Sequence, residues 1–193
     1  MVRHISASNA ANIQTALDAA DDEIVLGAGN FAIPDTLVQP FKISQVMRGV
    51  GAGNYTNPNH NHRGATTVLE WIPGTQIRPL LKLQGSYFAL RDMMLMGPET
   101  GIHIVKPRPG IGSGKHRFDN IVVEGADIAW QIAEDAGSQN CDVCSWRDIT
   151  VIQTDTAFKS LGHQAMQMQI SALHCRRVNT VLDIRGGGCW YAD

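Results

Sequence analysis

The chain has 193 residues, which suffices for one domain with a sizeable core. Its 16 basic and 18 acidic side chains give a net charge of -2, so the composition carries no electrostatic footprint for nucleic acid or an anionic membrane. No apolar run approaches the roughly 18 residues of a membrane span. We therefore expect no nucleic acid and no membrane among its partners, and the 19 glycines favour a turn-rich β architecture over a helical bundle.

Residues 9–20 predict a short amphipathic helix near the start of the chain. Asn9 is a plausible N-cap, and four apolar side chains share one face at the i, i+3, i+4, i+7 spacing: Ile13, Ala16, Leu17 and Ala20. An acidic turn over 21–23, a strand over 24–26 and a glycine-rich turn over 27–30 follow. From there, short β-like runs alternate with Gly, Pro, Asn and Asp to the end of the chain.

Two different motifs recur along the chain at the same successive offsets in sequence number: 28, 28 and 24. The first motif occupies residues 88–97, 117–125, 146–152 and 171–175, and the second occupies 100–104, 128–132, 156–160 and 180–184. Each unit is expected to form three short strands separated by turns, and one such unit cannot bury its apolar face alone. We therefore predict stacked coils of about 24 to 28 residues whose inward side chains form one continuous core.

Two columns of polar residues follow from this alignment. The first holds Asp92, Asn120 and Asp148, and the second holds Glu99, Asp127, Asp155 and Asn179. In a functional interpretation, the columns are rows of carboxylates. We prefer a structural interpretation as turn ladders, because Asx residues tolerate left-handed backbone and hydrogen-bond neighbouring backbone groups.

The first coils resemble a known family. Residues 13–33, and then 47–54 with 66–69, are similar to the N-terminal cap and the following coils of pectin-lyase-like proteins, which include phage tailspikes and pectate-lyase-like domains. The resemblance covers essentially the whole chain. It implies an all-β, right-handed parallel β-helix (a solenoid) with a short N-terminal capping α-helix, as a single domain over 1–193 with coils over about 23–185. The last residues, 186–193, show no recognisable cap, so we expect an end that is incomplete or covered by a partner.

Several motifs have both a structural and a functional interpretation. The glycines over 49–53 suggest a phosphate loop but lack its Gly-Lys-Ser/Thr ending, so we predict a coil turn. Cys141 and Cys144 form half of a zinc motif that Cys175, His163 or His174 would have to complete. With four cysteines and no secretory signal, we expect free thiols instead, with no metal and no cofactor.

Two further groups of residues suit contacts with sugars. The polar loop over 54–63 carries His60 and His62, which suit a metal or a sugar, although a solvated loop or a subunit contact is more common. The recurring aromatic residues suggest stacking platforms for sugars, but their strand positions favour core rungs: Phe88, Phe118, Trp130, Trp146 and Phe158.

The strongest candidate site comes from alternation along the second motif. With the apolar residues of these strands pointing inward, an outward column remains, with one basic residue two positions beyond it: His103, Gln131, Lys159, Asp183 and then Arg185. The family resemblance implies that this face forms the glycan groove. A Lys or Arg beside an Asp suits the binding of an acidic sugar, or the roles of base and charge neutraliser in a β-elimination. We assign Lys159 and Asp183 as candidate catalytic residues, and His103, Gln131 and Arg185 to substrate binding. An ordinary polar sheet face is the alternative.

The sequence thus predicts a glycan-directed protein, tailspike-like or polysaccharide-lyase-like, that binds and in one version cleaves a polysaccharide. The column offers one carboxylate where glycoside hydrolysis needs two, and it lacks the acidic cluster of a calcium-dependent lyase. If the protein is an enzyme, we expect a polysaccharide lyase or a glycoside hydrolase. The alternative is a non-catalytic virion spike or fibre module, a rigid rod that forms a homo-oligomer such as a trimer or binds other virion proteins. Either version predicts a virion or extracellular location.

Overall fold

The computed structural model describes residues 1–41, 43–52, 66–72, 79–106, 112–134, 141–162, 165, 167–186 and 188–192. Within these ranges the chain is all-β apart from two short helical segments, a 3-10 turn over Ala7–Asn9 and helix α1 (Asn12–Ala19). The strands are β1 (Val2–Ile5), β2 (Glu23–Leu26), β3 (Gly29–Ile33), β4 (Leu37–Gln39), β5 (Ile43–Arg48), β6 (Thr67–Trp71), β7 (Pro79–Leu83), β8 (Ser86–Met96), β9 (Thr100–Ile104), β10 (Arg117–Glu124), β11 (Ile128–Ile132), β12 (Ser145–Ser160), β13 (Met168–Ile184) and β14 (Trp190–Ala192).

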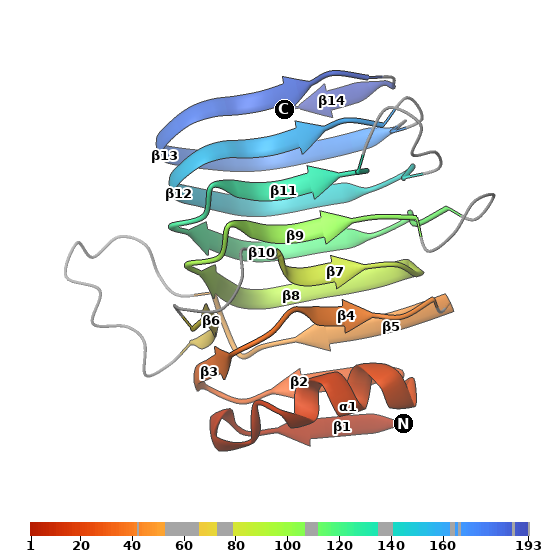
Figure 1. Ribbon diagram of the computed structural model, residues 1–193, viewed down its shortest axis with the longest axis vertical. Coiled ribbons are helices and arrows are strands. Elements are labelled where there is room, and N and C mark those ends of the chain that lie inside the picture. Colours follow the sequence, from red (N-terminus) through yellow and green to blue (C-terminus); the bar gives the residue numbers. More distant parts are fainter. Residues whose placement is uncertain are drawn as a thin grey trace.

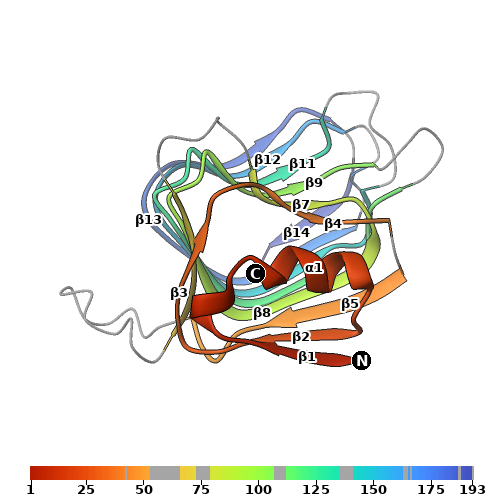
Figure 2. The ribbon, with the colours of Figure 1, turned by 60° about the horizontal axis from the view of Figure 1, so that its bottom comes forward.

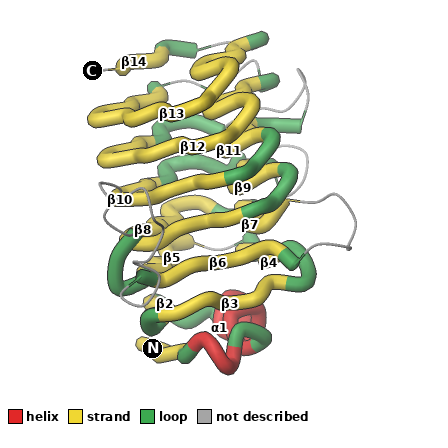
Figure 3. Tube along the Cα trace, turned by 90° about the vertical axis from the view of Figure 1, so that its left-hand side faces the viewer, coloured by secondary structure: helices red, strands yellow, loops and turns green. Residues whose placement is uncertain are grey.

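All of these strands belong to one sheet, and each described pairing is parallel. Ten of them form one continuous path, in the order β1-β2-β5-β8-β10-β12-β11-β9-β7-β4. The sheet is strongly curled, so that successive segments of the chain lie in layers from β1 at one end to β13 and β14 at the other (Figures 1 and 3). In a view with the N-terminal end turned forward, α1 lies across the opening of the curled sheet (Figure 2).

The strand register confirms the predicted repeat. In the first motif Val122 lies opposite both Met94 and Thr150, and Thr150 lies opposite His174, which reproduces the offsets of 28, 28 and 24 in sequence number. The second motif pairs in the same way, from β9 through β11 and β12 to β13. Both motifs therefore stack layer on layer in the predicted alignment.

Single left-handed residues bend the long strands. The predicted Asx column has φ angles of 57°, 51° and 52° at Asp92, Asn120 and Asp148, and Ala172 continues it at 52°. Asn120 also donates a side-chain hydrogen bond to Asp92 at 2.8 Å, which confirms a turn ladder. The second predicted column is also linked across layers, since Asn179 donates to Asp155 at 2.8 Å.

Two more left-handed columns exist that the sequence did not reveal. One holds Gly97, Gly125, Gln153 and Arg177, and the other holds Ser44, Tyr87, Lys115, Val143 and Gln167. β12 and β13 run through their bends without interruption. In each of these two layers the three predicted short strands are therefore one continuous strand, of 16 residues in β12 and 17 in β13.

The interior is filled by the predicted aromatic rungs. Phe88, Phe118, Trp130, Trp146 and Phe158 are each at most 1% exposed. Phe118 stacks on Trp146 with ring centroids 5.4 Å apart, and Trp130 stacks on Phe158 at 5.0 Å. Aromatic stacking adds to the apolar area that these rings remove from water. The rings are core, and a sugar cannot reach them.

The N-terminal prediction needs correction. The helix does not begin the molecule, because β1 precedes it and pairs with β2. It is also shorter than residues 9–20, and Asn9 is not its N-cap: Asn9 lies in the 3-10 turn, where its side chain donates to Ser6. Ile13, Ala16 and Leu17 are fully buried as predicted, whereas Ala20 leaves the buried face as a left-handed C-cap with φ 69°.

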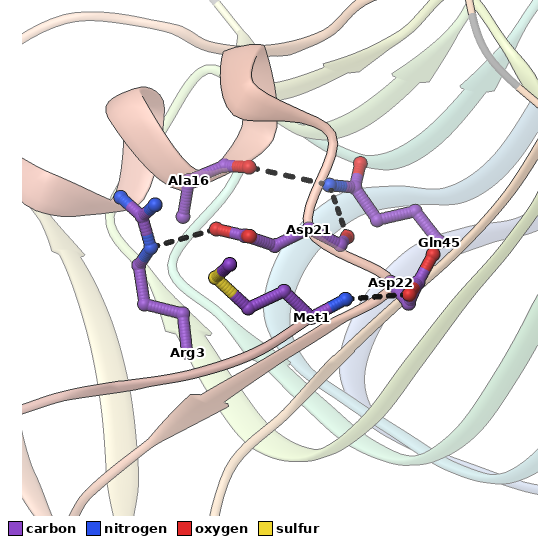
Figure 4. Close-up of polar contacts among 6 residues, drawn as sticks. All are labelled: Met1, Arg3, Ala16, Asp21, Asp22 and Gln45. Atoms are coloured by element: carbon purple, nitrogen blue, oxygen red, sulfur yellow. Dashed lines mark hydrogen bonds and ion pairs between the residues drawn. The ribbon is translucent and has the colours of Figure 1, made fainter.

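A polar cluster fixes this end of the molecule (Figure 4). The Arg3 guanidinium pairs with the buried Asp21 carboxylate at 2.6 Å, and Gln45 of β5 donates to the Asp21 carbonyl at 2.9 Å. The Met1 ammonium pairs with Asp22 at 2.5 Å. These contacts join β1, β5 and the turn after α1, so the helix cannot shift without breaking buried polar contacts.

Candidate functional site

The predicted outward column is present and one residue longer than expected. Lys82, His103, Gln131, Lys159 and Asp183 lie opposite one another in register on β7, β9, β11, β12 and β13. Each is partly exposed. We call these five residues the polar strip. It crosses five neighbouring strands at about 4.8 Å per strand, so it offers one polar side chain at each step of an extended surface.

Buried neighbours hold the strip in position. The residues on either side of Lys82, His103 and Gln131 are fully buried, which turns the polar side chains outward. The last layer differs from the prediction, since Leu182 and Ile184 beside Asp183 are 41% and 39% exposed. They pair with Phe158 and Ser160 on one side, but β14 pairs only with residues 168–170 of β13 and leaves them open.

The centre of the strip has a fixed hydrogen-bonding pattern. His103 Nε2 lies 3.3 Å from the Ala133 carbonyl, and Gln131 Nε2 donates to the same oxygen at 3.4 Å. Burial lowers the pKa of His103, and the carbonyl contact opposes this only in part. A neutral ring that donates through Nε2 presents Nδ1 as an acceptor. His103 and Gln131 thus supply the neutral hydrogen-bonding groups that hydroxyls require.

Charged groups lie at the two ends of the strip. Lys82 is 3.6 Å from Glu134, a carboxylate that the sequence pattern did not reveal. At the other end Arg185 pairs with Asp183 at 2.9 Å, and this hydrogen-bonded contact lowers the pKa of the carboxyl. Asp183 is therefore an ionised acceptor near neutral pH, with Lys159 between it and the neutral centre. The structure brings all five predicted site residues together on one face.

A second surface, which sequence reasoning missed, lies on the outward side of β5, β8, β10, β12 and β13. It contains a hollow of about 540 Å³ that continues into another of about 410 Å³, and the two share Arg91, Arg117, Ser145 and Gln169. We call this surface the basic groove, after its cations, and define it by Tyr87, Arg91, Lys115, Arg117, Gln167 and Gln169. The repeat in the sequence could have indicated this surface, because it places Tyr87 beside Lys115 in neighbouring layers. It also places Asp119 between Arg91 and Arg147.

The glycine-rich turn does not have the geometry of a phosphate loop. The amides of Gly49 and Gly51 donate to the carbonyls of Arg91 and Asp92, both at 3.0 Å, and the Val50 amide donates to the Thr67 hydroxyl. A phosphate would need these amides unoccupied. Over residues 49–52 the segment packs against β8 as the predicted coil turn, and Gly53 lies outside the described residues.

The CxxC motif is a pair of buried thiols. Burial raises the pKa values of Cys141 and Cys144 to about 12, while Cys175 and Cys189 are exposed. Within the described ranges, no three His, Cys, Asp or Glu side chains are grouped to hold a metal ion. His60, His62 and His163, named above as possible ligands, lie outside the described residues.

Next to these thiols is a buried polar pair that the sequence did not reveal. His116 Nε2 lies 3.1 Å from the Ser113 hydroxyl, and the Phe88 amide donates to His116 Nδ1 at 3.3 Å. Both His116 and Ser113 are fully buried. They contact no solvent, so they serve the packing between the layers of β8 and β10.

Comparison with known proteins gives structural neighbours only. No protein-family model and no curated protein sequence matches the chain. The A-module of the mannuronan C-5 epimerase AlgE6 from Azotobacter vinelandii is similar in structure, with a TM-score of 0.53 and 15% identity over 94% of this chain and 53% of that one. ORF18 of Geobacillus virus E2 has a TM-score of 0.47 and 11% identity, covering 88% of this chain and 41% of that one.

A rhamnogalacturonan lyase has a TM-score of 0.40 and 10% identity, covering 88% of this chain and 54% of that one. By their names, this lyase and the epimerase act on polysaccharides.

In the described part of the chain, no helix has the length and apolarity to cross a membrane. The chain spans about half the length of the epimerase module, and its likeness to that module is one of fold.

Proposed function

We propose that the protein is a right-handed parallel β-helix that binds an extended polysaccharide along the polar strip. The observation that carries this proposal is the unbroken register of five outward polar side chains, from Lys82 to Asp183, across five strands. The right-handed sense rests on the strong preference of parallel crossovers for that hand. The fold likeness to a module named for a mannuronan epimerase supports the glycan as ligand.

The strip suits binding better than hydrolysis. Its neutral centre, His103 and Gln131, offers groups that pair with sugar hydroxyls, and its ends offer charge of both signs. Hydrolysis needs one carboxyl held protonated, and the low pKa of Asp183 works against that role. For a β-elimination we propose Lys159 or the ionised Asp183 as the base and Arg185 as the cation that neutralises the sugar carboxylate, with tailspike-like or lyase-like action outside the cell or on a virion.

A glycan-array screen followed by titration with the best ligand tests the proposal. We expect Lys159→Ala with Asp183→Ala to weaken binding at least about tenfold, because each side chain supplies a charge-assisted hydrogen bond. Asp18→Ala with Arg176→Ala is the matched control, since it removes the same two charges from exposed positions elsewhere. Unchanged binding in the strip variant would exclude the strip. Incubation with the bound polysaccharide, read as new reducing ends or as absorbance of unsaturated products, tests cleavage.

A second candidate function is a structural module that assembles with copies of itself or with virion proteins. The exposed apolar side chains at the last layer favour it, namely Val181, Leu182 and Ile184. Molecular mass in solution tests this version. A monomer at all concentrations argues against self-association, and blank glycan arrays combined with a trimer would favour the module over the glycan-binding protein.

A further inference from the structure

The basic groove holds positive charge that the protein does not neutralise. Arg91 and Arg117 form no ion pair and no side-chain hydrogen bond within the described residues. On the same face Arg147 is paired, with its guanidinium 2.5 and 3.1 Å from the two Asp119 carboxylate oxygens. Among the residues that the structure describes, no carboxylate lines the 540 Å³ hollow, which contains Lys115 as well. Three cations in such a hollow form a complement to an anionic ligand.

The groove also contains a tyrosine and two glutamines, which are side chains suited to contacts with sugars. Tyr87 is 46% exposed, and Lys115 donates to its hydroxyl at 2.7 Å, which fixes the ring at the edge of the hollow. Gln167 and Gln169 add exposed amides from the layer of β13. The Lys115 ammonium also lies over the Tyr87 ring, 4.8 Å from its centroid. A partly exposed aromatic ring beside amide donors and acceptors suits a sugar, which is apolar on one face and carries hydroxyls at its edge.

The shape of the groove indicates a long ligand. It is lined from five neighbouring strands, β5, β8, β10, β12 and β13, and continues past Arg91 and Arg117 into the second hollow. A guanidinium presents a planar fork that matches a carboxylate with two parallel hydrogen bonds. We propose that the basic groove binds an acidic polysaccharide whose sugars carry carboxylates. The groove and the polar strip are built from different strand segments, so this proposal stands without the strip.

Calorimetric titration with polygalacturonate, alginate and hyaluronate oligosaccharides tests this site, with dextran oligosaccharides as the neutral comparison. We expect at least one acidic chain to bind and dextran not to bind in the groove. Arg91→Gln with Arg117→Gln should weaken that binding about 100-fold, about tenfold for each lost charge-assisted contact. Raising the salt from about 20 to about 300 mM should weaken it as well, because exposed charges are screened.

Arg176→Gln, an exposed arginine outside the groove, is the matched control and should bind like the unaltered protein. Equal thermal melting of all variants shows that the fold is intact. The proposal is overturned if no acidic chain binds, if the double arginine variant binds normally, or if single-stranded DNA binds more tightly and depends on the same arginines. Loss of binding in Lys159→Ala with Asp183→Ala, but not in the double arginine variant, would overturn the groove and leave the strip as the glycan site.

Discussion

The buried pair of His116 and Ser113 leads to a quantitative prediction about stability and pH. The Phe88 amide can only donate, so His116 Nδ1 must accept, and the ring proton is on Nε2. The Ser113 hydroxyl donates to the Gly85 carbonyl at 2.7 Å, so it accepts from that proton. Protonation of Nδ1 would place two N–H groups against each other and bury a charge. Burial accordingly lowers the pKa of His116 to about 3.

The low pKa of His116 determines how the free energy of unfolding changes with pH. An unfolded histidine titrates near 6.5, so below that pH the unfolded chain binds a proton that the folded chain excludes. The contribution of the neutral His116 to the free energy of unfolding is fully present above about pH 6.5 and is lost progressively as the pH falls toward 3. The slope approaches about 1.4 kcal/mol per pH unit, which amounts to about 2 kcal/mol between pH 7 and pH 5.

Urea denaturation of matched variants at about pH 7 and about pH 5 measures this effect. His116→Asn keeps an acceptor near the Phe88 amide, whereas His116→Leu leaves that buried donor unpaired, so the Leu variant should be less stable than the Asn variant by about 1–3 kcal/mol at neutral pH. Both variants lack the titration, so their deficit against the unaltered protein should shrink by about 2 kcal/mol at pH 5.

His174→Asn, at an exposed position, serves as the control and should differ from the unaltered protein by no more than about 0.5 kcal/mol at either pH. A deficit of His116→Asn that stays constant between the two pH values would refute the neutral buried histidine.

Three further predictions concern the bends, the N-terminal cluster and the thiols. Asn120→Ala should lower the free energy of unfolding by about 1–2 kcal/mol, and Asn120→Gly should lower it by less, since glycine tolerates a φ of 51°. Ala172→Asn should raise the free energy of unfolding by about 0.5 kcal/mol, because Asn tolerates left-handed backbone better than Ala. Equal losses for Asn120→Ala and Asn120→Gly would contradict this explanation of the bend. Arg3→Met leaves a buried carboxylate unpaired and should cost about 2–4 kcal/mol in urea denaturation, so a loss below about 0.5 kcal/mol would contradict it. A thiol reagent should modify two cysteines of the native protein and four in urea, and rapid reaction of Cys141 or Cys144 would contradict their burial.

The repeat could be found in the sequence because parallel layers pair in register. A residue and its neighbour one layer away occupy the same environment, so the chain repeats residue types at the offsets that separate the layers. The strand over Val2–Ile5 escaped notice because four residues are too few to show alternation. The predicted helix boundary was wrong because Asn9 suits a cap in sequence, yet its side chain bonds back to Ser6 in a separate 3-10 turn.

The two candidate surfaces differ in how visible they are. The polar strip lies on straight strands, where period-two alternation holds, although Lys82 was missed because its step to His103 is shorter than any offset of the repeat. The basic groove lies beside left-handed bends. Within β8 the residues with no exposed area are Phe88 and Leu90 before Asp92, and Met93 and Leu95 after it, so one bend residue changes which alternate positions face inward. Alternation followed across such a bend assigns outward residues to the wrong face.

The left-handed column at the edge of the groove left no sequence signal for a related reason. Its members, Ser44, Tyr87, Lys115, Val143 and Gln167, share φ angles of 58° to 67° but no chemistry. In the Asx column the side chains bond one another, so the bend selects the residue type. Here the residue type changes from layer to layer, and the hydrogen bond from Lys115 to the Tyr87 hydroxyl joins two long side chains at the edge of the groove without selecting for left-handed backbone. An exposed tyrosine and lysine in strained backbone, beside two arginines without a partner among the described residues, are explained by ligand binding better than by folding.

The repeat length itself connects the two surfaces. Each layer contributes first to the groove and then to the strip, and the bends between these segments are single residues. Length varies in the return from strip to groove: Ile104 to Arg117 and Ile132 to Ser145 each span 13 positions, but Ser160 to Gln169 spans nine, which is the difference between offsets of 28 and 24. Insertions between these positions change the length of the return without disturbing either ladder. A stack of this kind can therefore vary the length of this return while the registers that build the two candidate surfaces stay fixed.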